Sequence, residues 1–286
     1  MNSLMSFVIV SLSVVLGFAW ANGPFSVLFQ PHELIIILGT ALGALIGYAP
    51  LHMFGKILKS IPRAFRGSGV TKNTYLDLMG LLLTVFNTIR REGVLGIEDD
   101  LADPAHSERF KKYPLIAKNP EAMDLLVGSL RLFIDGVVNA FDLDKLMETE
   151  IEAREKESSH VPLLLGRCAD ALPGLGIVGA VLGIIITMQH VDGPPSVFGH
   201  NIAAALVGTF LGILLSYGYV QPIASSIEMI NHESQVLLHA IRAAVVSFAG
   251  GAPPTVALEF ARKSIEGNMR PTADEIEAIT QAVRRG

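Results

Sequence analysis

Two long stretches of this chain contain no basic residue. No Lys or Arg occurs before Lys56, and none lies between Arg167 and Arg242. The 22 basic residues of the 286-residue chain therefore fall into two segments, with 16 in residues 56–167 and six in residues 242–286. Only 17% of the residues are charged, whereas soluble domains carry about 25%. With a mean hydropathy of +0.47, this pattern indicates an integral membrane protein.

Four apolar segments account for the stretches without basic residues, and they cover residues 3–21, 33–51, 170–190 and 201–222. Each has about the 20 residues that an α-helix needs to cross the hydrocarbon core. Links rich in Pro and Gly, residues 22–32 and 191–200, join the segments in pairs. We therefore expect four transmembrane helices.

The distribution of basic residues also predicts the orientation of the chain. Because cytoplasmic loops are rich in Lys and Arg, the long basic segments are expected in the cytoplasm, together with both termini. The predicted organisation is a first pair of spans, a cytoplasmic helical domain, a second pair of spans and a cytoplasmic helical tail, in residues 1–51, 52–169, 170–222 and 223–286.

The N-terminal segment resembles a cleavable signal peptide in one feature, the small-residue site Ala19–Trp20–Ala21. Residues 1–7, however, contain no Lys or Arg, and a cleavable signal has a basic region there. We expect the segment to be retained as a true span. Cys168 is the single cysteine, so an intramolecular disulfide is excluded.

The segments outside the spans have helical patterns. Apolar residues recur near the helical period in residues 71–93, and residues 119–141 and the charged residues 142–160 are predicted as two further helices. Thr272 followed by Glu275 predicts a capping box at the start of a last helix. The expected fold class is an all-α integral membrane protein, with a large helical cytoplasmic domain between spans 2 and 3.

Small residues recur every fourth position on three of the spans. This spacing places them on one helix face, where two backbones can approach closely. Such faces pack within one chain, between subunits or against a foreign helix, and the sequence leaves these alternatives open. The residues are Gly39, Gly43 and Gly47 on the second span; Gly176 with Ala180, and Gly179 with Gly183, on the third; and Ala204, Gly208, Gly212 and Ser216 on the fourth.

Two prolines lie at the ends of the second pair of spans. Pro173 falls within a turn of the start of the third span, and Pro222 lies at the end of the fourth. Proline is tolerated in the first turn of a helix and kinks a helix further inside. The two residues are interpreted either as boundary markers or as the ends of helices that move.

Charged side chains are missing from the middles of the four spans. Glu33 and Asp170 lie at span edges, and the polar residues at depth are Thr40, Thr209 and several serines, with Tyr217 near one end. Proton and sodium pathways usually depend on an ionisable group inside the membrane. Either the chain is structural, or another polypeptide supplies the titrating carboxylate.

Taken together, five stretches of the chain resemble the MotA family, the membrane stator subunits of bacterial flagellar motors. They are "QPHELIIILGTALGALI" (30–46), "YLDLMGLLLTVFNTIRREGVLGIEDD" (75–100), "DALPGLGIVGAVLGII" (170–185), "ALVGTFLGILLSYGYVQPIA" (205–224) and "PPTVALEFARKSI" (253–265). The resemblance implies an inner-membrane protein of which five copies, as a pentamer, surround two single-span MotB-type helices. It further implies that an Asp on that partner binds the ion, and that ion passage turns the rotor through FliG.

The resemblance also assigns roles to individual residues. The family's functional prolines fall on Pro173 and Pro222, and its rotor-contacting charges fall on Arg90 and Glu98, with Glu150 as a further candidate. From the residues alone, helix-dipole complementarity is a competing explanation for Arg90 and Glu98. Exposed charges stabilise a fold little, but they can steer and orient a docking partner.

The residues that would face the ion favour a proton over sodium. Sodium-type members of the family carry ion-facing threonines on the third and fourth spans. Here the third-span position is Ala180, and the fourth-span pair is Gly208–Thr209, which offers one hydroxyl. We expect the translocated ion to be a proton, with no bound cofactor or metal.

Three other functions compete with this interpretation. An energiser similar to ExbB or TolQ is the main alternative, although those proteins have three spans, and an adjacent partner sequence would discriminate. A transporter acting alone predicts a midplane charge or a discontinuous helix pair. An enzyme is disfavoured because phosphate-binding and metal-binding motifs are missing. His190 and His200 are expected at the outer membrane interface.

Overall fold

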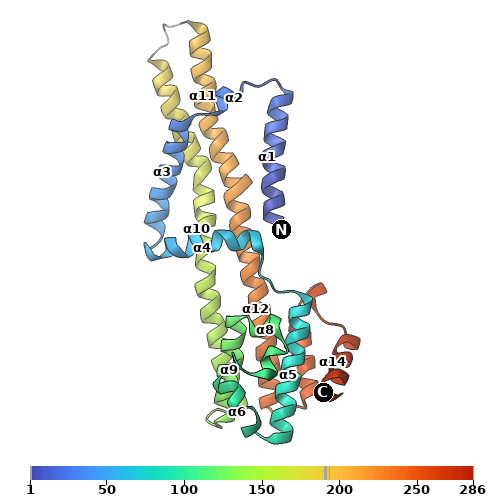
Figure 1. The fold of residues 1–286 in the computed structure, drawn as a ribbon. Coiled ribbons are helices and arrows are strands. Elements are labelled where there is room, and N and C mark those ends of the chain that lie inside the picture. The colour runs from blue at the N-terminus through green and yellow to red at the C-terminus, as the bar shows by residue number, and fades with distance from the viewer. Residues whose placement is uncertain (1, 190–191, 193, 286) are drawn as a thin grey trace. The chain divides into compact units, whose positions relative to one another are not determined.

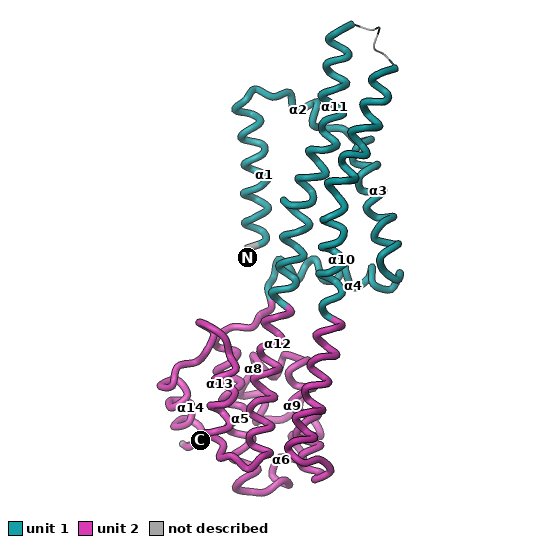
Figure 2. Tube along the Cα trace, turned by 180° about the vertical axis from the view of Figure 1, so that it is seen from behind, with its two compact units in different colours: residues 1–67, 158–230 teal, residues 68–157, 231–286 magenta. Residues whose placement is uncertain are grey.

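The structure is a computed structural model that describes residues 2–189, 192 and 194–285. Its described residues form helices and no strand, and four of the helical stretches are long and apolar enough to cross a membrane. The predicted all-α fold class is therefore confirmed (Figure 1). The chain divides into two compact units, residues 1–67 with 158–230 and residues 68–157 with 231–286 (Figure 2).

The division places residues 52–67, 158–169 and 223–230 with the spans. The sequence prediction had assigned these residues to the cytoplasmic segments. At the predicted boundaries near residues 170 and 222, a helix continues without a break. At the predicted boundary near residue 51, α4 packs in one core with the end of α3. Hydropathy alone therefore does not mark where a compact unit ends.

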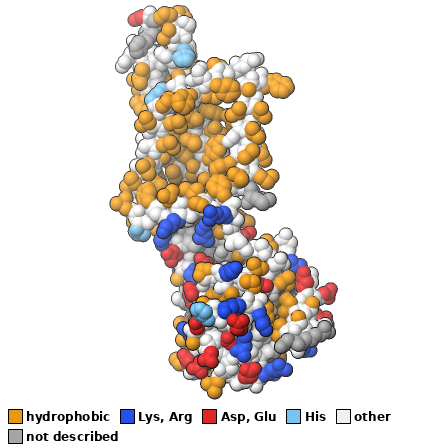
Figure 3. All heavy atoms as spheres, viewed as in Figure 1, with side chains coloured by type: hydrophobic (Ala, Val, Ile, Leu, Met, Phe, Trp, Pro, Cys, Tyr) orange, Lys and Arg blue, Asp and Glu red, His pale blue; other side chains and the backbone are white. Residues whose placement is uncertain are grey.

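The first unit contains the predicted spans. Its elements are α1 (Asn2–Trp20), α2 (Phe25–Leu28), α3 (Pro31–Tyr48), α4 (His52–Arg66), α11 (Pro195–Ile213), the π-helical segment η1 (Leu214–Val220), residues 158–188 of α10 (Ala140–Met188) and the start of α12 (Gln221–Ala249). Its surface is a broad apolar band (Figure 3). Large apolar side chains such as Leu4, Ile9 and Ile35 are exposed on it, as expected for helices that face lipid.

Helix α4 is an amphipathic helix at one end of the apolar band, where basic side chains gather (Figure 3). Met53, Ile57 and Ala64 form its buried face, and its Lys and Arg side chains are exposed. A separate helix was not predicted here, although its apolar positions follow the helical period. Ser3 ties α1 to it by donating from Oγ to the Ala64 carbonyl at 3.0 Å.

Two predicted helix boundaries are wrong. The charged helix 142–160 and the third span form one continuous helix, α10, of 49 residues. The intervening residues contain no pair of adjacent helix breakers, and α10 includes Pro162 and Pro173 in its interior. The predicted helix 119–141 ends at Ile134, because Gly136 has a φ of +64°, a left-handed conformation that terminates a helix.

The second unit is built around α5 (Lys72–Glu92), which is buried along most of its length and contributes side chains to one hydrophobic core. The unit also contains residues 140–157 of α10 and residues 231–249 of α12. Its other elements are α6 (Leu95–Ala102), α7 (Glu108–Lys111), α8 (Pro114–Ala117), α9 (Pro120–Ile134), α13 (Pro254–Ser264), the 3₁₀ turn η2 (Gly267–Met269) and α14 (Ala273–Arg285). Phe86 of α5 stacks on Phe248 of α12 with ring centroids 4.2 Å apart. This stacking joins segments far apart in the sequence.

The predicted capping box at the start of α14 is confirmed. The Thr272 backbone N–H donates to Glu275 Oε2 at 2.7 Å, and the Glu275 N–H donates to Thr272 Oγ1 at 3.2 Å. Lys72 lies 2.8 Å from the other oxygen of Glu275. These contacts hold the pKa of the Glu275 carboxyl below its ordinary value, first through the hydrogen bond from Lys72 and then through the backbone of Thr272.

Candidate functional site

Helices α10 and α11 contact each other through their backbones. A methyl group added at Gly176 would lie 2.7 Å from the Gly208 carbonyl oxygen and 3.0 Å from the Gly212 Cα. One added at Gly212 would lie 2.6 Å from the Leu172 carbonyl oxygen. Only glycine allows this approach, because ordinary carbon contacts begin near 3.4 Å. These glycines therefore pack two helices of the same chain.

The remaining glycines of the pair surround a carboxyl group from α3. Gly179 and Gly208 face Glu33 Oε2, and a methyl group at Gly183 would lie 3.3 Å from Glu33 Oε1. The prediction that Glu33 lies at a span edge holds for its own helix, because it is in the first turn of α3. Its side chain is nevertheless fully buried. A carboxyl group of this chain thus lies against the glycines of α10 and α11, the two inner helices of the unit.

Pro173 leaves a backbone carbonyl of α10 without its usual helical donor, a consequence that was not predicted from the sequence. Because proline has no N–H, Pro173 cannot donate to the carbonyl of Ala169, four residues earlier. Ser216 Oγ, from η1, donates to this carbonyl at 2.6 Å, and the serine is fully buried. The only sequence signal was the position of Ser216 in the small-residue line. This bond links the proline of α10 to the π-helical segment of the neighbouring helix.

The π-helical segment ends at Val220, two residues before Pro222. The Gln221 N–H donates to the Ser216 carbonyl, five residues earlier, which is the bond of a π-helix. Pro222 lies inside a continuous helical stretch from Pro195 to Ala249, so it does not mark a helix end as predicted. The wider π turn accommodates a residue that lacks an N–H.

The other predicted pathway residues differ in exposure. Ala180 is buried beside Gly208, Thr209 and Pro173 are half-buried, and 64% of Tyr217 is exposed. The structure therefore brings Ala180 to the α10–α11 contact and leaves Tyr217 on the outside of this single chain. Nothing lies within 4 Å of methyl groups built at Gly39, Gly43 and Gly47, so this line does not pack against the described residues of the chain. His200 is exposed, and His190 lies outside the described residues.

The predicted rotor-facing charges lie at neighbouring helix ends of the second unit. Arg90 is in the last turn of α5, as predicted, and Glu98 is in the first turn of α6. Both are exposed, and neither makes an ion pair within the described part of the chain. Glu150, by contrast, accepts a hydrogen bond of 2.6 Å from Arg154 one turn later on α10.

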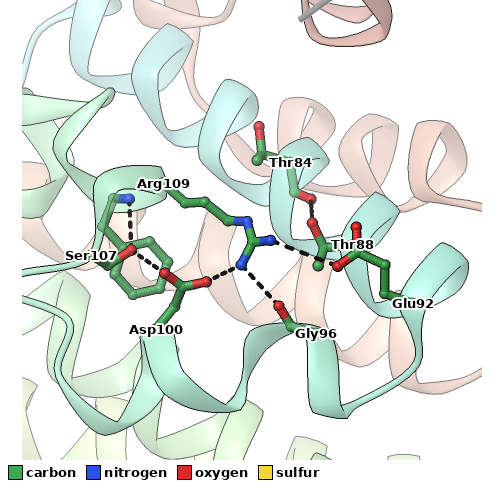
Figure 4. Close-up of polar contacts among 8 residues, drawn as sticks. Thr84, Thr88, Glu92, Gly96, Asp100, Ser107 and Arg109 are labelled. Carbon is green, nitrogen blue, oxygen red and sulfur yellow. Dashed lines mark hydrogen bonds and ion pairs between the residues drawn. The ribbon is translucent and has the colours of Figure 1, made fainter.

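A polar network that the sequence did not reveal fixes α6, the helix that carries Glu98 (Figure 4). The Arg109 guanidinium pairs with Asp100 and donates to the Gly96 carbonyl at 2.8 Å, and it lies 3.7 Å from Glu92. Ser107 Oγ donates to Asp100 at 2.6 Å. Because these groups come from α5, α6 and α7, the network sets the position of the α5–α6 corner.

The fold and this site define a class of protein: an all-helical, multi-pass membrane protein with two tightly packed inner helices and a separate helical unit. Comparison with known families matches residues 4–93 to the model "Motility protein A N-terminal" and residues 119–240 to the "MotA/TolQ/ExbB proton channel family".

Curated relatives match along nearly the whole chain. The chain is 36% identical to Motility protein A of Salmonella typhimurium over 281 residues, covering 98% of this chain and 95% of the relative. It is 35% identical to Motility protein A of Escherichia coli with the same coverage, and 32% identical to Chemotaxis protein LafT of Vibrio parahaemolyticus with 97% of each covered. The chain belongs to the motility protein A family.

Two solved structures have the same fold. "Structure of C. jejuni MotAB" superimposes with a TM-score of 0.79 at 18% identity, covering 95% of this chain and 98% of the other. "Structure of the flagellar MotAB stator complex from Bacillus subtilis" gives 0.76 at 22% identity, covering 97% and 99%.

Proposed function

We propose that this chain is a subunit of a flagellar motor stator, which forms a proton-conducting complex with a MotB-type partner and converts ion-motive force into torque. The observation that carries this proposal is the 36% identity to Motility protein A along the whole chain. The same length of match disfavours the ExbB- or TolQ-like alternative, as do four candidate spans in place of three. The chain lies in the inner membrane with both termini in the cytoplasm, as its basic residues predict.

The partner contributes the carboxylate that the inner helices receive. Five copies of this chain surround the partner's helices, and an Asp on the partner binds the proton. The solved relatives are complexes of MotA with MotB, which supports a partner for this chain. Tyr217 is exposed in η1, and its exposure suits a contact with another chain.

Proton binding is coupled to movement through Pro173 and Pro222. The interruption at each proline lowers the stiffness of its helix, and the Ser216–Ala169 bond ties the two interruptions together. A change in how the partner's helix packs near Thr209 would therefore be felt by both helices. Since α10 is continuous from Ala140 to Met188, it can transmit the change along its length.

Arg90 and Glu98 act on the rotor protein FliG. Both charges are exposed without an ion pair within the described residues, so they are available to a charged partner surface. Glu150 is a weaker candidate, because Arg154 already occupies its carboxylate. Ala180 offers no ligand to a sodium ion, and Thr209 offers one hydroxyl, which supports a proton as the translocated ion.

Deletion of the gene tests the proposal, with swimming scored and filaments counted in the same cells. Cells with normal filaments that do not swim are expected. Restoration of swimming by the wild-type gene, and failure of restoration by a Pro173→Leu variant present at equal membrane level, completes the test. Full swimming of cells that carry Pro173→Leu together with Arg90→Glu contradicts the proposed mechanism.

A further inference from the structure

Glu33 is an acidic residue whose buried carboxyl group makes no hydrogen bond within the described part of the chain. Its side chain has 0% exposure, and neither carboxyl oxygen has a hydrogen-bond partner among the residues that the structure describes. A carboxylate that is buried without a hydrogen-bond partner is strongly destabilising unless it is neutralised or paired. Something that neutralises or pairs with this group must therefore be part of the working protein.

The surroundings of Glu33 are shaped for a carboxyl group. Gly208 contributes to this space, since a methyl group there would lie 2.5 Å from Oε2, and Gly179 and Gly183 line it from α10. Burial of Ile37 and Ala41 on the same face of α3 shows that Glu33 belongs to the surface that packs inward. The glycines therefore make room for the acid.

One titratable group connects this site to the outside. His32 Nε2 lies 3.8 Å from Glu33 Oε1, and 59% of the histidine side chain is exposed. Gly179 and Gly183 of α10 and Gly208 of α11 face the Glu33 carboxyl, and none of them carries a charge. His32 is thus the one titratable group that faces the buried carboxyl within the described residues.

We propose that Glu33 is a proton-binding site of this chain, on the outer part of the proton pathway between α3, α10 and α11. This inference rests on the proposed stator function and on the predicted orientation, in which Glu33 lies at the end of α3 remote from the basic α4. A proton arrives from hydronium or from the His32 imidazolium and converts the Glu33 carboxylate to the carboxylic acid, releasing water or neutral imidazole. The carboxylic acid of Glu33 then passes this proton on to the carboxylate of the partner.

Three variants test this site in the complex with its partner. Glu33→Gln keeps the shape of the side chain and removes proton binding, and Glu33→Asp keeps the acid but moves it. Glu228→Gln is the matched control, because Glu228 is an exposed carboxyl group of the same unit. The carboxyl band in infrared difference spectra of the purified complex is recorded against pH, and motor speed is recorded against external pH.

The expected result is a carboxyl band that disappears in Glu33→Gln, shifts in Glu33→Asp and persists in Glu228→Gln. Motor speed should fall several-fold in Glu33→Gln at equal membrane level, most at high external pH, where protons are scarce. Should Glu33→Gln fail to accumulate, the band and pH profile of Glu33→Asp provide the test. Spectra and speeds equal to those of the wild type in either variant overturn the inference.

Failure of the inference is distinguishable from failure of the proposed function. A wild-type complex that drives rotation but shows no Glu33 band leaves the stator function intact and overturns the site. A complex that shows the band but neither conducts protons nor drives rotation overturns the proposed function and, with it, the place of Glu33 in a pathway.

Discussion

Gly212→Ala is expected to destabilise the contact between α10 and α11 by a predictable amount. The new methyl group would lie 2.6 Å from the Leu172 carbonyl oxygen and 2.8 Å from the Gly176 Cα, where ordinary contacts begin at 3.4 Å. Both neighbours are backbone atoms, so no side-chain rotation relieves the clash. The helices must separate by about 0.8 Å, and overpacking of this kind costs about 1–3 kcal/mol.

Gly174→Ala is the matched control, because it lies inside α10, the helix that α11 contacts, and no described atom lies within 4 Å of its added methyl group. Both variants gain about 1 kcal/mol of helix propensity, so the difference between them measures the overpacking alone. Denaturant unfolding of the purified complex in detergent should place Gly212→Ala below Gly174→Ala by about 1–3 kcal/mol. Equal free energies of unfolding for the two variants would refute the close contact.

Three further predictions follow from other parts of the molecule. Arg90→Glu should reduce torque strongly without changing the amount of protein in the membrane, whereas Arg91→Glu, one residue further, should reduce torque less. Bead rotation assays measure the torque of both variants, and equal losses would contradict a specific role for Arg90. Ser216→Ala leaves the Ala169 carbonyl unpaired and should lower the free energy of unfolding by about 0.5–2 kcal/mol, measured by thermal unfolding in detergent; no loss would show that the bond is not formed. Burial raises the pKa of Tyr75 from 10.0 to about 12; because the ionised form is disfavoured in the folded state, stability should be unaffected below pH 10.0 and fall as pH rises toward 12. Tyrosinate absorbance and unfolding should show this fall in the wild type and a smaller one in Tyr75→Phe, and identical curves would contradict the assignment.

Much of the fold could be predicted from the sequence, because it depends on local patterns. Runs of about 20 apolar residues revealed the spans, and the Thr272–Glu275 pair revealed the start of α14. Boundaries failed where the deciding signal is weak. Pro173 and Pro222 suggested helix ends, yet both helices continue. Near Pro173 a serine of the neighbouring helix donates to the free carbonyl, and a π-helical segment precedes Pro222.

The site was predicted less completely, because its central contacts join residues distant in sequence. Glu33 was predicted at a span edge, because hydropathy shows only where a residue lies along its own helix. It does not show which other helices the side chain contacts. Its burial depends on where α10 and α11 lie. The Arg109–Asp100 network likewise depends on the turn between α6 and α7, which no periodic pattern specifies. The spacing of the glycines was the one sequence signal that predicted a close helix–helix contact on α10 and α11.

The most direct test of the central claim is the speed of single motors in cells that depend on this chain, measured while proton-motive force and external sodium are varied independently. For a proton-driven stator, speed should follow proton-motive force, fall to zero with an uncoupler and stay unchanged when sodium is removed. Speed that follows sodium and survives collapse of the proton gradient would contradict it.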